Sequence, residues 1–71
     1  MKIYTQDRNH VVEVPRELWV TQVGENGAIF ATTYSVNPLG NYGSPERARE
    51  VLSELFQYYR NGKNSYIMPL E

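Results

Sequence analysis

The sequence predicts an α+β fold in which an antiparallel sheet of four to five short strands packs on one amphipathic helix. Two pairs of strand-like segments lie on either side of turn residues in the first half of the chain. After residue 44, the spacing of the apolar residues changes from a period of two to the period of about 3.6 that is typical of a helix. The 71 residues contain no internal repeat or linker, and they fit a single domain, residues 1–71.

The first predicted hairpin joins residues 2–6 (KIYTQ) to residues 11–14 (VVEV). Both segments are rich in residues that suit strands, and the polar run at 7–10 between them has turn-forming residues. Pro15 is expected to end the second strand, because proline has no N–H to donate to a neighbouring strand.

The second predicted hairpin joins residues 18–23 (LWVTQV) to residues 28–34 (AIFATTY). Asn26 and Gly27 lie between these two apolar runs. Both residue types tolerate the positive φ of a type I′ turn, so we expect the turn there. Residues 35–43 are expected to be mostly loop, with room for a very short strand.

A helix is predicted over residues 45–60. Ser44 is a preferred N-cap residue, Pro45 fits the first helical position, and Glu46 places negative charge at the positive end of the helix dipole. The apolar residues recur at the spacing of one helix face, at Ala48, Val51, Leu52, Leu55, Phe56 and Tyr59.

The helix is expected to end at Asn61-Gly62, because glycine readily adopts the left-handed conformation that follows many helices. Residues 65–69 (SYIMP) then form a final short strand, which Pro69 closes. This strand completes the predicted sheet.

Strand parity divides the second hairpin into two faces. With the turn at Asn26-Gly27, one face pairs Trp19 with Tyr34, Thr21 with Thr32 and Val23 with Phe30, and we expect the helix on this large apolar face. The other face has no charge and carries Leu18, Val20, Gln22, Ile29, Ala31 and Thr33. An uncharged aliphatic face on the outside of a sheet needs a cover. Either the long loop and the termini supply it, or the face is a subunit or partner interface.

The sequence also predicts that this small chain self-associates. A chain of 71 residues without cysteine has neither a large core nor a disulfide to stabilise it. Together with the charge-free face, this predicts a homo-oligomer, most simply a dimer.

Composition argues against several classes of function. Seven basic and eight acidic residues give a net charge of -1, and the basic residues are scattered, which argues against binding of duplex nucleic acid. No segment has the length and hydropathy of a membrane span or a signal peptide, so a cytoplasmic protein is expected. The only histidine, His10, lies in the polar turn, and the carboxylates show no metal-ligand spacing. We therefore expect no catalytic residues, no metal and no cofactor.

The glycine-rich run before the helix has two interpretations. Gly40 and Gly43 could let backbone N–H groups face an anion at the helix start, with Arg47 or Arg49 assisting. Pro45 removes one of the donors that such a site uses, and the run matches no nucleotide-binding fingerprint. In the alternative interpretation, the glycines only permit a sharp entry to the helix.

Three segments resemble a large set of small proteins found in Firmicutes and their phages and prophages. These are the opening MKIYTQD, the segment LGNYGSPERAREVLSELF and the closing YIMPL. The shared motifs cap and pack the helix, at Ser44, Glu46 and Ala48 among others. The resemblance implies a phage or prophage accessory protein, and small proteins of that origin often act by binding, including as inhibitors of a bacterial defence protein.

Two functional hypotheses follow. The first is an inhibitor or adaptor that binds a host protein through the second face of the sheet, the loop at 35–43, or both. The second is an oligomeric sponge that sequesters a nucleotide or another anionic signal molecule, because arginine and aromatic side chains together suit a base and its phosphate. The candidate ligand-binding residues are Tyr42, Gly43, Ser44, Arg47, Arg49 and Tyr58. Arginines that converge across a subunit boundary would favour the sponge.

Overall fold

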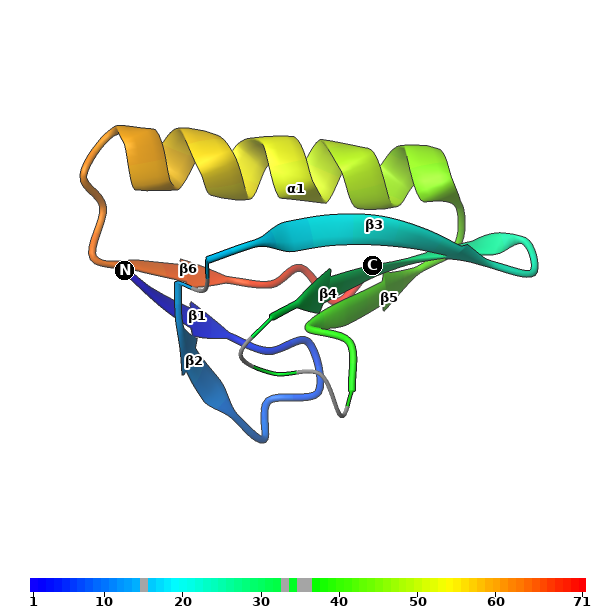
Figure 1. The fold of residues 1–71 in the computed structure, drawn as a ribbon, viewed down its shortest axis with the longest axis horizontal. Coiled ribbons are helices and arrows are strands. Elements are labelled where there is room, and N and C mark those ends of the chain that lie inside the picture. The colour runs from blue at the N-terminus through cyan, green and yellow to red at the C-terminus, as the bar shows by residue number, and fades with distance from the viewer. Residues whose placement is uncertain (15, 33, 35–36) are drawn as a thin grey trace.

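A computed structural model describes residues 1–14, 16–32, 34 and 37–71 of the chain. This part of the chain forms one helix and six strands, which lie in two three-stranded sheets (Figure 1). The elements are β1 (Lys2–Tyr4), β2 (Val11–Glu13), β3 (Leu18–Val23), β4 (Asn26–Ala31), β5 (Gly40–Tyr42), α1 (Pro45–Arg60) and β6 (Ser65–Ile67). The α+β class is confirmed, but the strands form two small sheets instead of the expected single sheet of four to five strands.

The first sheet has the order β2-β1-β6. β1 and β2 form the expected antiparallel hairpin, and Asp7 organises the turn between them by accepting hydrogen bonds from Thr5 Oγ1 at 2.7 Å and from the Asn9 N–H at 2.9 Å. The hydrogen bond from Thr5 is the main cause that lowers the pKa of Asp7. β6 pairs with β1 in parallel, so the expectation of a purely antiparallel sheet is wrong at this position. β2 ends at Glu13, and Pro15, which was expected to end this strand, lies outside the described residues.

The second sheet has the order β3-β4-β5. The hairpin of β3 and β4 is confirmed, but its turn is Gly24-Glu25, and Val23 pairs with Asn26. Gly24 has a φ of 61°, so the two-residue turn has its positive φ in the first position, as in a type II′ turn. The predicted turn at Asn26-Gly27 is therefore wrong, and Trp19 pairs with Phe30 and not with Tyr34.

Gly27 explains why the Asn-Gly pair is not the turn. It lies inside β4 under the start of the helix, where a Cβ atom would come within 2.6 Å of Pro45 Cα and 2.8 Å of Ala48 Cβ. Glycine at this position allows the helix to approach the sheet closely. Residues 40–42, expected as loop with room for a very short strand, form β5 beside β4.

The helix has the predicted bounds. Ser44 Oγ accepts a hydrogen bond from the Arg47 N–H at 3.1 Å, and Pro45 occupies the first turn. At the other end, the Asn61 N–H donates to the Gln57 carbonyl at 3.0 Å, and Gly62 has a φ of 73°. The local signals at both ends of the helix are confirmed.

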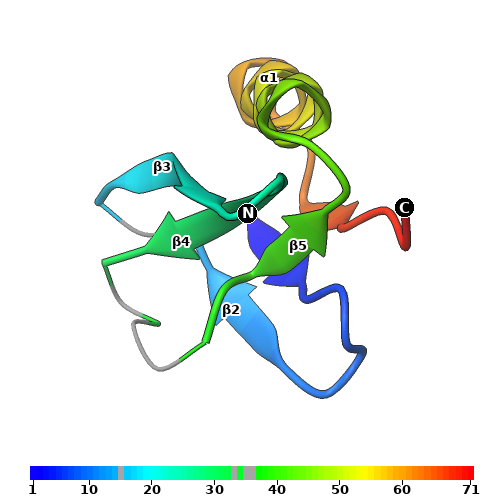
Figure 2. The same ribbon diagram turned by 90° about the vertical axis from the view of Figure 1, so that its right-hand side faces the viewer.

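The helix lies on the face of β3 and β4 that was expected to be outside. Ile29 and Ala31 are 0% exposed, and Leu18 and Val20 pack against the core, whereas Trp19 is 41% exposed. Viewed along its axis, α1 lies on one side of the strands, which curve around the core beneath it (Figure 2). The predicted choice of face is therefore wrong, although the division of the residues between the two faces is right. The buried core of both sheets and the helix includes Ile3, Ile29, Leu39, Tyr42, Val51, Leu55, Tyr66 and Met68.

Gln6 connects the two sheets where β1 ends and β5 begins. Its N–H donates to the Leu39 carbonyl at 2.9 Å, and its side-chain carbonyl oxygen accepts from the Asn41 N–H at 2.6 Å. Its side-chain amide also donates to the main-chain oxygen of Leu70 at 2.8 Å. These hydrogen bonds link the two sheets to each other and to the segment after β6.

Candidate protein-binding surfaces

The glycine-rich run forms the start of the helix. The Ser44 hydroxyl serves as the N-cap, and Gly43 is exposed with no atom within 4 Å of the position that a Cβ would take. Arg47 extends over the Tyr42 ring, with its guanidinium carbon 5.9 Å from the ring centroid. The same guanidinium donates to the main-chain oxygen of Glu71 at 2.7 Å and lies 3.6 Å from a Glu50 carboxylate oxygen. Four of the predicted ligand residues therefore lie near the helix start, and the arginine among them already has partners.

The other two predicted ligand residues lie elsewhere on the helix. Arg49 belongs to the outer helix face, together with Glu46, Glu50 and Glu54. Tyr58 packs edge-on against Tyr66, with 5.0 Å between the ring centroids. Within one chain, the two arginines do not converge on a shared pocket with Tyr58.

Two of the six predicted interface residues lie in the core, and two more pack against it. Ile29 and Ala31 are fully buried within the chain, and Leu18 and Val20 are half-buried against that core. Gln22 is exposed near the end of β3, and Thr33 lies outside the described residues. The prediction that this face is open to another subunit is wrong at the two buried positions, because the helix and the neighbouring strands cover them.

The aromatic face of β3 and β4 is exposed. The sequence analysis did not predict this surface, because it placed the helix on this face. The Trp19 and Phe30 rings stack across the two strands, with 6.2 Å between their centroids and 22° between their planes. Val23 is exposed on the same strand face. The sequence did hold a signal: Leu, Val, Ile and Ala are fully buried more often than Trp, so the aliphatic face was the better candidate for the core.

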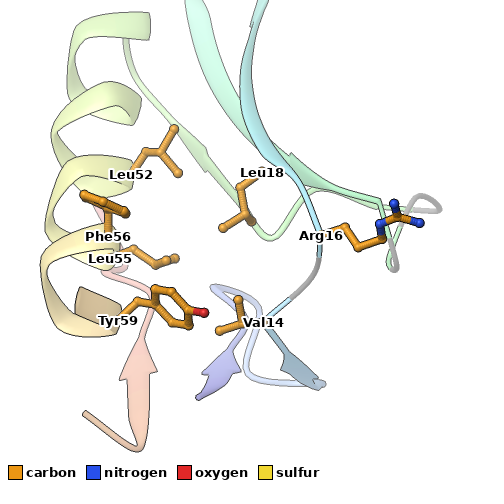
Figure 3. A pocket seen from close by; sticks show the side chains of 7 residues that line it. All are labelled: Val14, Arg16, Leu18, Leu52, Leu55, Phe56 and Tyr59. Atoms are coloured by element: carbon orange, nitrogen blue, oxygen red, sulfur yellow. The ribbon is translucent and has the colours of Figure 1, made fainter. Parts of the chain in front are cut away.

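A groove lies beside the start of β3, between this strand and the helix (Figure 3). We call it the β3 groove; its volume is about 420 Å³, and its lining residues are Val14, Arg16, Leu18, Leu52, Leu55, Phe56 and Tyr59. In Figure 3 the Tyr59 ring extends toward Val14, and the Arg16 side chain extends away from the helix. Phe56 and Tyr59, which were expected to pack on the sheet, are 58% and 53% exposed. The sheet therefore does not cover all of the apolar residues on this side of the helix.

The outer face of the first sheet carries a third apolar surface. Tyr4 is the register partner of both Val11 and Ile67, and all three side chains are exposed. The Arg8 guanidinium carbon lies 5.4 Å from the centroid of the Tyr4 ring. This row contains no tryptophan or phenylalanine.

The ionisable groups of the described residues form no recognisable catalytic or metal centre. The His10 ring shares a hydrogen bond with the Tyr34 hydroxyl at 2.9 Å, and both residues are outside the core. Across the described ranges, no three His, Cys, Asp or Glu side chains gather closely enough to hold a metal ion. No helix in this part of the chain has the length and hydropathy needed to cross a membrane. The exposed apolar and aromatic surfaces are therefore the candidate sites among the described residues.

Comparisons with protein-family models, with curated proteins and with solved structures found no match to this chain.

Proposed function

We propose that this protein acts without catalysis, by binding another protein through the aromatic face of β3 and β4. The observation that carries the proposal is the position of Trp19, the only tryptophan of the chain, which lies outside the core and stacks on Phe30. Tryptophan is enriched among the residues that dominate the energy of protein interfaces. The two rings already pack on each other, so less conformational entropy is lost when a partner covers them.

The setting of this binding follows from the sequence resemblance. A phage or prophage accessory protein would bind a protein of its bacterial host, and we propose a host defence protein as the class of target. Small accessory proteins can block a larger enzyme by covering a surface, and no chemistry by the inhibitor is needed. The described residues, with their isolated His10 and scattered carboxylates, suit this mode of action.

Affinity capture from a bacterial host extract, followed by mass spectrometry, tests the proposal. The bait proteins are the wild type, Trp19→Ala, and Tyr4→Ala as the matched control. Tyr4 is 37% exposed, close to the 41% of Trp19, but lies on the first sheet. Truncating a tryptophan that dominates an interface costs about 2 kcal/mol or more, so the affinity for the captured protein should fall about thirtyfold or more in Trp19→Ala. A partner retained equally by wild type and Trp19→Ala would contradict this assignment of the surface.

The nucleotide sponge is the weaker proposal. Arg47 lies over the Tyr42 ring, which suits a base or phosphate, but its guanidinium already donates to the Glu71 main chain. Thermal shift with nucleotides, cyclic dinucleotides and sugar phosphates tests the sponge directly. A rise in melting temperature that Arg47→Glu and Gly43→Val each abolish, while both variants stay folded, would favour the sponge over protein binding.

A further inference from the structure

β3 is an edge strand without the usual protection of an edge. Only β4 pairs with it among the described strands, and its six residues, LWVTQV, contain no charge and no proline. The other edge strands, β2, β5 and β6, have three residues each. Native proteins protect sheet edges by keeping them short, by placing charges or proline on them, or by covering them. An unprotected edge of this length is typical of a strand that pairs with another chain.

The backbone groups that face the open edge can be assigned. The Thr32 N–H donates to the Glu17 carbonyl at 3.1 Å, so Glu17 directs its backbone groups toward the β4 side. In an antiparallel pair the direction alternates along the strand. The N–H and C=O groups of Leu18, Val20 and Gln22 therefore point away from β4, toward the side on which no described strand pairs with β3.

The β3 groove lies next to this edge and is lined by apolar and aromatic residues together with Arg16. Leu18 lines it and is half-buried, and the helix residues Phe56 and Tyr59, which also line it, are mostly exposed. A strand added to the open edge of β3 would lie next to the groove that these two aromatic rings line. The open edge and the groove are thus parts of one continuous surface.

We propose that a second copy of the chain occupies this surface, with the two β3 strands paired antiparallel about a two-fold axis at Val20. Val20 then faces Val20 of the partner subunit, and Leu18 faces Gln22 of the partner subunit. Each of these pairs exchanges N–H···O=C bonds, and this register uses every outward-facing residue of β3. The two second sheets become one continuous sheet, with both helices on the same face.

A second copy fits better than an unrelated strand for two reasons. An uncharged strand meets no like charge within the paired residues when it pairs with itself. The two-fold axis also places the side of each helix that carries Phe56 and Tyr59 next to the helix of the partner subunit. A foreign strand would pair with the edge but would supply no such helix to cover these rings.

Sedimentation equilibrium of the full chain at tens of micromolar tests the proposal. The wild type should have twice the 8.2 kDa mass of the chain. Gln22→Pro removes an outward N–H without removing a bond to β4, so it should sediment at the mass of one chain with an unchanged circular dichroism spectrum. Gln22→Ala keeps the N–H and is the matched control, which should remain a dimer.

Amide hydrogen exchange supplies a readout at the edge itself. In the wild type, the amides of Leu18, Val20 and Gln22 should be protected, and in Gln22→Pro the protection at Leu18 and Val20 should be lost while that at Trp19 remains. A wild type that sediments as a single chain, or a folded Gln22→Pro that remains dimeric, overturns the proposal.

A second variant keeps the test decisive if Gln22→Pro does not fold. Phe56→Gln combined with Tyr59→Gln changes only exposed side chains on the helix. This double variant should sediment as one chain, whereas Ser53→Gln on the outer helix face should remain a dimer. A dimeric double variant would show that the groove is not part of the interface and would also overturn the proposal.

Discussion

Gly27 lies where the helix comes closest to the sheet, and side-chain volume is critical there. A Cβ at this position would lie 2.6 Å from Pro45 Cα and 2.8 Å from the Ser44 carbonyl oxygen, and both are backbone atoms that cannot move alone. We predict that Gly27→Ala lowers the free energy of unfolding by about 1–3 kcal/mol, as overpacking of a core does. Urea denaturation measures the loss.

Gly43 provides the control for this prediction. It lies directly before the helix, but nothing lies within 4 Å of its would-be Cβ and its φ is not positive. Gly43→Ala should therefore change the stability by less than about 1 kcal/mol. Equal losses in the two variants would mean that the close approach of the helix is not what requires Gly27.

Two buried tyrosines should make the stability fall at high pH. Burial raises the pKa of Tyr42 to about 12, and its hydroxyl donates to the Pro69 carbonyl at 2.9 Å. Burial, with a further contribution from the hydrogen bond to Glu54, also raises the pKa of Tyr66. Tyrosine in an unfolded chain ionises near pH 10, so above that pH the unfolded chain loses protons that the folded chain retains. The stabilising contribution is complete below about pH 10 and is lost as the pH rises toward 12.

Urea midpoints measured from about pH 9 upward test this prediction. Tyr42→Phe should show a shallower fall above about pH 10 than the wild type, although its stability at neutral pH should be lower by about 1 kcal/mol for the lost hydrogen bond. Tyr4→Phe, at an exposed position, controls for the number of tyrosines. If the slopes of wild type and Tyr42→Phe coincide, Tyr42 does not contribute to the pH dependence.

At the scale of the elements, the start of α1 depends on its cap. Ser44 Oγ accepts from the Arg47 N–H at 3.1 Å and satisfies one of the N–H groups that have no partner within the helix. We predict that Ser44→Ala lowers the free energy of unfolding by about 0.5–2 kcal/mol, measured by urea denaturation. Ser53→Ala, on the exposed face of the same helix, should be neutral or slightly stabilising, because alanine has the higher helix propensity. A Ser44→Ala variant as stable as the wild type would show that the cap is dispensable.

The sequence predicted the helix well because the signals that begin and end it are local. The Ser44, Pro45 and Glu46 start and the Gly62 end act within one turn of the chain, and the observed bounds match. The sheet was harder to predict because its pairing depends on residues far apart in the sequence. The parallel contact between β1 and β6, for example, depends on how the helix leads the chain back beside its first strand.

The hairpin of β3 and β4 shows a second limit of prediction from sequence. Alternation assigned Leu18, Val20, Ile29 and Ala31 correctly to one face, but a period of two does not say which face is covered. The turn was wrong by two residues, because both Gly24 and Gly27 suit a turn and only the position of the helix distinguishes them. A shift by two residues preserves parity, so each residue was still assigned to the correct face despite the error in register. The candidate aromatic surface was not predicted because the wrong face was expected to be covered by the helix.

For the whole molecule, charge argues against binding to duplex DNA. The chain has a net charge of -1, and three of its basic residues, Lys2, Arg8 and Arg47, lie close to acidic, carbonyl or aromatic groups of the chain itself. Without a basic face, the release of counterions that supplies most non-specific affinity is missing. We predict no shift of duplex DNA in gel electrophoresis at low salt with micromolar protein. A complex that disappears as salt is added would contradict this prediction.

The wider consequence of an open β3 edge is that stability should depend on protein concentration. If two chains pair through β3, the folded dimer is favoured over two unfolded chains by mass action. Each tenfold rise in protein concentration should then raise the melting temperature of the wild type by about 3–5 °C, given the entropy of unfolding expected for a domain of this size. Gln22→Pro should melt at one temperature whatever the concentration, and Gln22→Ala should follow the wild type. Calorimetry over a hundredfold range of concentration measures the effect, and a melting temperature of the wild type that stays constant over this range would contradict the link between the open edge and stability.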